Sequence, residues 1–115
     1  MLGPIMDTFE FLLQKAEESF EILRPLGFEI ERRSLVSPDS FRGGFEIWFS
    51  KPGARLEIEY LEMQLEVRLG AVEIFGPSIH PGFGGNMFSG PHLVEHLPTI
   101  SKIVRSTYDH LAHGA

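Results

Sequence analysis

Cysteine is absent from the 115-residue chain, and its absence excludes several kinds of site. Disulfides, thiolate metal sites, iron–sulfur clusters and cysteine nucleophiles all need a thiol. Basic residues are also few, 10 against 16 acidic residues, which gives a net charge of −6. Because a chain of this charge repels a phosphate backbone, we expect no nucleic-acid partner. Any metal site must therefore be built from histidine and carboxylate side chains.

Long apolar runs are missing as well. No segment approaches the roughly 18 uncharged apolar residues that a membrane-spanning helix needs, and the first residues combine neither a basic start nor a long apolar stretch. We therefore expect no membrane association, no secretory signal and a cytoplasmic location. The hydrophobic fraction of 43% is ordinary for globular proteins, and no repeat or linker divides the chain. The sequence thus predicts a single domain over residues 1–115.

Helical periodicity marks both ends of the chain. Asp7 is a suitable N-cap, with Glu10 in the capping-box position, for a first helix that ends at Pro25 and Gly27. Pro98 suits the first position of a last helix. The inward stripes expected on the two helices are Phe9, Leu12, Leu13, Ala16, Phe20 and Leu23 on the first, and Ile100, Ile103, Val104, Thr107 and Leu111 on the last.

Between the helices the apolar period changes from about 3.6 to about 2, which is typical of strands with one buried face. Strands are predicted around residues 28–35, 45–50, 56–60 and 63–69, and the short connection between the last two indicates an antiparallel hairpin. Its register has two alternatives. Pairing Tyr60 with Met63 places Glu57 opposite Glu66, whereas an offset of two residues avoids this like-charge contact.

At Gly70 the apolar phase slips by one residue. Either a bulge or a tight turn at Gly70 would explain the slip, and both leave Glu73 and Phe75 on the polar side of the sheet. The order of elements is then helix, four or five antiparallel strands, loop and helix. This order predicts an α+β fold, a two-layer sandwich in which both terminal helices cover one face of an antiparallel meander.

The strand alternation places charged residues on the sheet face away from the helices. Trp48, the one tryptophan of the chain, lies in the middle of this face, and Phe75 is expected at one edge. Tryptophan is frequent at binding hot spots, and a field of one sign speeds encounter with an oppositely charged partner. A solvated sheet face would show the same alternation. The acids expected there are Glu29, Glu31, Glu46, Glu57, Glu59, Glu66 and Glu73, and the bases are Arg33, Arg55 and Arg68.

We therefore expect a non-catalytic protein-binding module whose acidic sheet face holds a basic protein or a second copy of the chain in a homodimer. No catalytic residue and no cofactor are assigned to this function. The binding residues expected are Trp48, Glu46, Glu57, Glu59, Glu66 and Phe75.

His92, Glu95 and His96 form the pattern H-x-x-E-H, which resembles the zinc-binding motif of inverzincin metalloproteases. On a helix both imidazoles would share one face and could bind zinc, with Glu95 as the base for a metal-bound water. The resemblance implies a further acidic ligand downstream, and Asp109 is the one acid that follows. A small metal-dependent enzyme is therefore the alternative function.

Residues 76–92 form a long segment rich in glycine and proline. Its glycines do not match a phosphate-binding pattern, and it contains no lysine or arginine, so we expect no nucleotide there. Its apolar side chains either cover an open end of the core or form the wall of a pocket beside His80. The second reading would make the protein a small-ligand carrier. The apolar residues concerned are Ile79, Phe83, Met87 and Phe88.

Three segments carry a broader resemblance: Arg24-Pro25-Leu26-Gly27-Phe28, Gly44-Phe45-Glu46-Ile47-Trp48-Phe49, and the hairpin from Arg55 to Gly70. In layout they resemble small bacterial α+β proteins of unknown function, some of which are immunity or antitoxin partners. The resemblance implies a packing pattern and transfers no catalytic residue. It fits an acidic surface, because a nuclease toxin is often basic where it grips nucleic acid.

Overall fold

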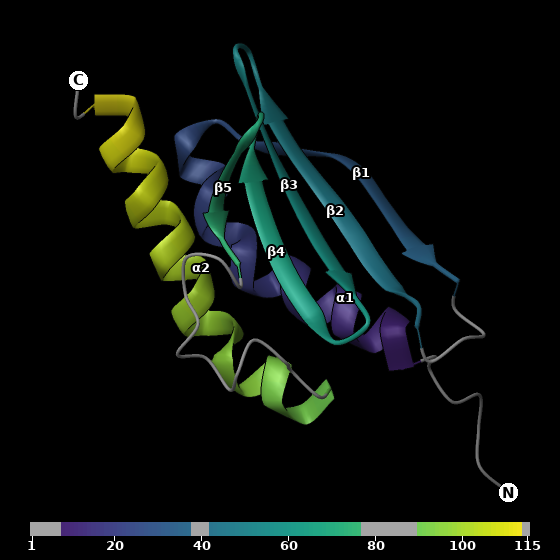
Figure 1. The fold of residues 1–115 in the computed structure, drawn as a ribbon. Helices are drawn as coiled ribbons and strands as arrows, with labels where there is room; N and C mark the ends of the chain where they lie inside the picture. Colours follow the sequence, from purple (N-terminus) through teal and green to yellow (C-terminus); the bar gives the residue numbers. More distant parts are fainter. Residues whose placement is uncertain (1–7, 38–41, 77–89, 114–115) are drawn as a thin grey trace, which may run out of the picture.

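The computed structural model describes residues 8–37, 42–76 and 90–113 (Figure 1). They form helix α1 (Thr8–Ser19), which continues as the 3-10 helix η1 (Phe20–Leu26), then strands β1 (Glu29–Val36), β2 (Gly44–Lys51), β3 (Ala54–Leu61), β4 (Gln64–Leu69) and β5 (Val72–Phe75), and helix α2 (Gly90–His113). The strands make one antiparallel sheet in the order β1-β2-β3-β4-β5. Helix α1 packs on β1 and β2, and α2 packs on β5, η1 and α1. The predicted α+β arrangement is confirmed.

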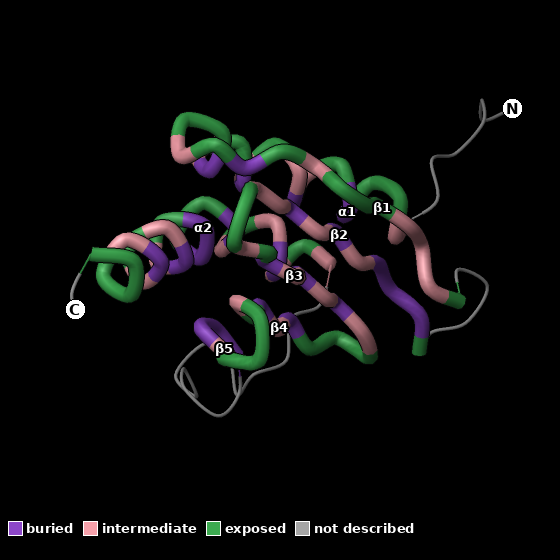
Figure 2. Tube along the Cα trace, turned by 90° about the horizontal axis from the view of Figure 1, so that it is seen from above, coloured by how far each residue is buried: buried purple, intermediate pink, exposed green. Residues whose placement is uncertain are grey.

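The core lies between the helices and the inner face of the sheet. Alternate side chains of β2 and β3 are buried, which Figure 2 shows as purple segments between pink ones. The helices close the core with residues at helical spacing, as the periodicity predicted. The largest inward side chains of the two central strands are Phe45, Ile47, Phe49, Leu56, Ile58 and Tyr60, and those of α1 and η1 are Leu12, Leu13, Phe20 and Leu23.

The first helical segment ends where the sequence predicted. Pro25 lies in η1, and Gly27 follows at φ 97°, in the left-handed region that favours glycine. The Gly27 N–H donates to the carbonyl oxygen of Arg24 at 2.9 Å, which closes the helix end. The chain then enters β1 directly, so that the edge strand lies beside α1.

Helix α2 begins earlier than predicted. The prediction placed Pro98 at the first helical position, but the helix starts at Gly90 and Pro98 lies inside it. Proline removes one helical hydrogen bond and its ring crowds the preceding turn, so helices bend there. Figure 1 shows the first turns of α2 lying at an angle to the rest. The early start also brings Leu93 and Leu97, both 0% exposed, into the core.

The inward stripe of α2 also differs from the prediction at its end. Leu111 is 48% exposed, whereas Tyr108, which the prediction omitted, is only 7% exposed. The Tyr108 ring meets the Phe28 ring edge-on, with centroids 5.0 Å apart. The Nζ atom of Lys51 lies 4.9 Å from the Tyr108 centroid. Tyr108 therefore joins the last turns of α2 to the end of β2, and Leu111 lies beyond this contact.

The hairpin of β3 and β4 adopts the offset register. Leu61 pairs with Gln64, and Glu57 lies opposite Arg68, so the like-charge pairing of Glu57 with Glu66 does not form. The structure thus adopts the second of the two alternatives that the sequence leaves open. The same register nevertheless places Glu59 opposite Glu66.

The change of apolar spacing near Gly70 corresponds to a tight turn that is followed by a bulge in β5. Leu69 pairs with Val72, so residues 70 and 71 make a tight turn, with Gly70 at φ 60°. A bulge follows, because Arg68 pairs with Glu73 but Val67 pairs with Phe75. The bulge turns Phe75 back into the core, where it is 1% exposed. The prediction that Phe75 belongs to the polar binding face is therefore wrong.

Candidate binding surface on the open sheet face

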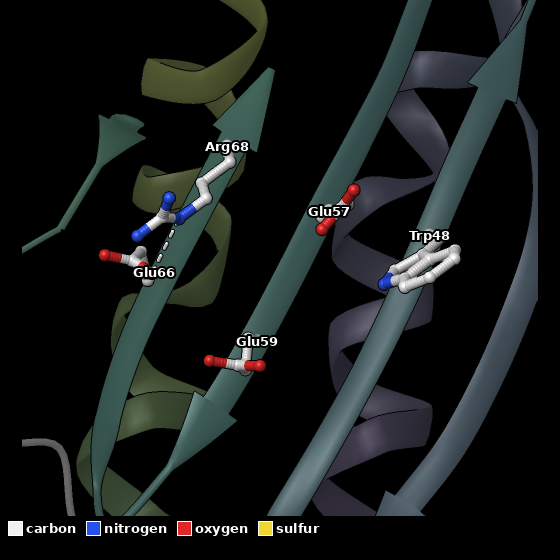
Figure 3. Close-up of a pocket in the computed structure, with 5 residues that line it drawn as sticks. All are labelled: Trp48, Glu57, Glu59, Glu66 and Arg68. Carbon is white, nitrogen blue, oxygen red and sulfur yellow. Dashed lines mark hydrogen bonds and ion pairs between the residues drawn. The ribbon is translucent and has the colours of Figure 1, made fainter. Parts of the chain in front are cut away.

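The sheet face away from α1 and α2, called the outer face below, carries charged side chains from all five strands. The register places two cross-strand rows on it. One row runs Arg32, Trp48, Glu57, Arg68 and Glu73, and the other runs Ser34, Glu46, Glu59 and Glu66. Figure 3 shows five of these side chains projecting from β2, β3 and β4, with the helices behind the sheet.

A bulge in β1 decides which arginine reaches the outer face. Ile30 pairs with Phe49 and Arg32 with Trp48, so Glu31 is the extra residue. Arg33 consequently lies opposite the buried Ile47 and turns toward α1, where its Nη2 atom is 2.6 Å from Glu17 Oε1. The prediction that Arg33 belongs to the polar face is wrong, and Arg32 takes its place. The run of three charged residues, Glu31 to Arg33, interrupts the alternation and is the sequence signal for this bulge.

The charge of the outer face is unchanged by this exchange. Its seven glutamates and three arginines give a net charge of −4, out of −6 for the whole chain. The acids are those predicted, and the bases are Arg32, Arg55 and Arg68. An oppositely charged surface would therefore be attracted to this face.

Trp48 is half-buried and is held by two arginines. The guanidinium carbons of Arg32 and Arg55 lie 5.0 Å and 4.7 Å from its ring centroid. Each arginine is fixed in turn by a glutamate. Arg55 donates to both carboxylate oxygens of Glu31, at 3.2 Å and 2.8 Å, and Arg32 Nη2 lies 3.0 Å from Glu46 Oε1. The β1 bulge thus supplies both Glu31 and Arg32 to a frame that fixes the tryptophan ring.

A concavity of about 260 Å³ opens beside this frame. It lies over β2, β3 and β4, and the Trp48 indole forms one wall (Figure 3). Arg68 Nε donates to Glu66 Oε1 at 3.0 Å on the opposite side. The full lining is Trp48, Glu57, Glu59, Glu66 and Arg68.

The neighbouring carboxylates Glu59 and Glu66 have opposite pKa shifts. Burial, together with the charges of Glu66 and Glu46, raises the pKa of Glu59 above its ordinary value. The pKa of Glu66 is lowered, chiefly by the hydrogen bond that it accepts from Arg68. Glu59 is therefore the acid of this row whose negative charge is least compensated by the protein itself.

The sequence-predicted binding residues mostly come together on this surface. Trp48, Glu57, Glu59 and Glu66 line one concavity, and Glu46 lies next to Glu59 in the register. Arg68 completes the lining. These residues follow from the alternation of side chains along β2, β3 and β4. The positions of Phe75 and Arg32 depend instead on the two bulges, which the alternation does not predict.

The histidine pair is arranged as the helical spacing predicts. The His92 and His96 rings lie edge to face on the first turns of α2, with centroids 4.5 Å apart. Residues 8–37, 42–76 and 90–113 contain no group of three or more histidine and acidic side chains that could hold a metal ion. A pair of imidazoles supplies only half of a tetrahedral zinc site. The described part of the chain thus provides no metal centre around His92, Glu95 and His96.

The predicted pocket beside His80, with Ile79, Phe83, Met87 and Phe88, lies outside the described residues. The last three residues of that predicted loop, 90–92, belong to α2. No helix among the described residues is long and apolar enough to cross a membrane. Comparison with known proteins finds no matching family model, no matching curated protein and no matching solved structure. The function must therefore be inferred from the site itself.

Proposed function

We propose that this protein is a non-catalytic binding module whose outer face docks a basic partner protein around Trp48. The observation that carries the proposal is the combination of a sheet face that neither α1 nor α2 covers, a net charge of −4 on it, and a half-buried tryptophan that forms one wall of a concavity of about 260 Å³. Interface hot spots combine such an aromatic anchor with polar surroundings. The role agrees with the implied resemblance to immunity and antitoxin proteins.

The charge favours a basic partner over a second copy of the chain. In a two-fold dimer the same patch meets itself, so the outer faces of two copies would oppose −4 to −4. Like charges brought together across an interface are unfavourable, whereas complementary charges speed association. Of the two occupants predicted from the sequence, a basic protein therefore has the better electrostatic support.

A second acidic surface on α1 provides the comparison that the proposal needs. A groove there is lined by Glu10, Gln14, Glu17, Glu18, Glu21 and Arg33, without any aromatic side chain. If acidity alone captured the partner, both surfaces would bind. The presence of Trp48 distinguishes the outer face, and we place the docking there.

The test compares a variant of the outer face with a charge reversal in the groove on α1. Glu57→Lys combined with Trp48→Ala alters the outer face, and Glu18→Lys alters the groove on α1. The immobilised proteins are exposed to a lysate, and the captured proteins are identified by mass spectrometry. We expect basic proteins captured by the wild type to be lost with the outer-face variant and retained with Glu18→Lys.

Two results would contradict the proposal. One is an unchanged set of captured proteins with the outer-face variant. The other is equal loss with Glu18→Lys, which would show that total charge and not this surface governs capture. Circular dichroism spectra of the variants confirm that each is folded.

A further inference from the structure

We infer that the outer face recognises its partner through an arginine side chain, whose guanidinium group enters the concavity beside Trp48 and pairs with Glu59. This inference rests on the proposed function and names the chemical group that the surface selects. Three observations support it: the position of Glu59 in the sheet, the contacts that the Trp48 ring already makes with two arginines, and the spacing of the surrounding carboxylates.

Glu59 is the central acid of the outer face, and its carboxylate is not paired with a cation in the part of the chain that the structure describes. It lies on the middle strand and pairs with Glu46 on one side and Glu66 on the other. Within the described residues the carboxylate of Glu59 accepts no side-chain hydrogen bond and makes no ion pair within 4.0 Å. Its two neighbours, by contrast, are bound to Arg32 and Arg68, each at 3.0 Å. A partner's cation would complete the row of three glutamates.

The Trp48 ring is already in contact with cations of the protein itself. Arg32 and Arg55 both lie within 5.0 Å of the ring centroid. Figure 3 shows the indole nitrogen of Trp48 on the side of the ring nearest Glu57 and Glu59. A cation in the concavity therefore meets the edge of the indole, which does not attract it as the face of a free ring would. The carboxylates, and not the aromatic ring, must hold the cation.

The ligand must therefore supply hydrogen-bond donors to these carboxylates. A guanidinium group has five N–H donors in a planar fork, which suits one carboxylate with two bonds and a neighbouring carboxylate with a third. Adjacent strands are about 4.8 Å apart, so Glu59 and Glu66 are close enough to share one such group. A quaternary ammonium group offers no donor at all. The surface therefore selects arginine, with lysine second and methylated ammonium groups last.

The experiment uses Trp48 as its own reporter. The chain has one tryptophan, so the indole N–H of the ¹⁵N-labelled protein gives one NMR signal. Methylguanidinium, methylammonium and tetramethylammonium chlorides are titrated separately at equal, low ionic strength. We expect a saturable shift with methylguanidinium, at least threefold weaker apparent affinity with methylammonium, and no saturable shift with tetramethylammonium.

Glu59→Gln is the test variant and Glu18→Gln on α1 is its matched control. We expect Glu59→Gln to weaken methylguanidinium binding at least fivefold and Glu18→Gln to leave it unchanged. The inference is overturned if tetramethylammonium binds as tightly as methylguanidinium, or if Glu59→Gln binds methylguanidinium as the wild type does. If basic proteins are still captured through the outer face in that case, the proposed function stands and only the arginine assignment fails.

Discussion

The two faces of the sheet are built from alternate residues of the same strands, yet different forces hold them together. On the inner face Phe49, Leu56 and Ile58 are each 0% exposed and make no use of charge. On the outer face, ion pairs such as Arg32–Glu46 and Arg68–Glu66 connect partly exposed side chains. Burial of apolar surface contributes far more stability than exposed ion pairs do. The inner face therefore contributes most of the stability of the fold, and the outer face contributes little.

The largest effect on stability is expected at Phe49 of β2, which lies on the inner face directly after Trp48 on the outer face. Phe49→Ala removes a fully buried ring that packs against Phe20, with centroids 6.4 Å apart. We expect the free energy of unfolding to fall by about 3–5 kcal/mol, because the lost contacts leave a cavity. Chemical denaturation measures this loss. A loss below about 1 kcal/mol would show that the inner face does not dominate stability.

The bulge in β5 gives the next prediction. Phe75 is 1% exposed, whereas Val72 on the same strand is 53% exposed. Phe75→Ala is expected to reduce the free energy of unfolding by about 3 kcal/mol, and Val72→Ala by about 0.5 kcal/mol or less. Equal losses for the two variants in the same denaturation assay would show that Phe75 is as exposed as Val72 and lies on the polar side, as the sequence predicted.

Trp48→Ala is expected to have a smaller effect on stability than either inner-face change. The substitution removes a half-buried ring and its contacts with Arg32 and Arg55. Each contact of this kind contributes about 0.5–1 kcal/mol, so we expect a loss of about 1–2 kcal/mol. Thermal and chemical denaturation measure the loss, and the far-UV spectrum should remain that of the wild type. A loss equal to that of Phe49→Ala would mean that Trp48 is a core residue and not a binding anchor.

The sequence predicts those features that depend on periodicity and fails where one residue breaks it. The α+β order of elements and the inward faces of β2 and β3 follow from apolar spacing. The β3–β4 register does not follow from charge pairing, because each of the two alternatives places two glutamates opposite each other. Each bulge adds one residue and reverses the face on which the later residues of the strand lie, so Arg33 and Phe75 were placed on the wrong side. Neither bulge carries a glycine, the residue that usually signals one. At the β1 bulge, Arg33 contacts Glu17 of α1 and Glu31 contacts Arg55 of β3, which are long-range contacts that apolar spacing does not encode.

Pro98 shows the same limit in a helix. The rule that proline begins helices is local, whereas α2 continues through Pro98 because Leu93 and Leu97 on one side and Ile100 and Val104 on the other are all buried in one core. Tertiary packing therefore outweighs the local preference. The candidate site was predictable in composition, because its residues lie on regular stretches of β2, β3 and β4.

The smallest expected effects distinguish two acids within the outer face. The pKa of Glu59 is raised by burial and by its acidic neighbours, so ionised Glu59 destabilises the fold. A group with a raised folded pKa contributes stability at low pH that is lost as the pH rises through that value. Glu59→Gln should therefore stabilise the protein near pH 7 by about 0.5 kcal/mol, the size of one like-charge cross-strand contact. This gain should disappear below the ordinary glutamate range, where wild-type Glu59 is itself neutral.

Glu66→Gln should have the opposite sign. The hydrogen bond from Arg68 lowers the pKa of Glu66, so its contribution is complete above the ordinary glutamate range and is lost as the pH falls through the lowered value. We expect Glu66→Gln to destabilise the protein near pH 7 by about 0.5 kcal/mol. Urea denaturation of both variants between about pH 3 and pH 7, the interval that spans the glutamate range, measures the two differences. Changes of the same sign would show that Glu59 and Glu66 respond alike to the negative field of the outer face. Glu59 would then not differ from Glu66 as a binding group for a partner's cation.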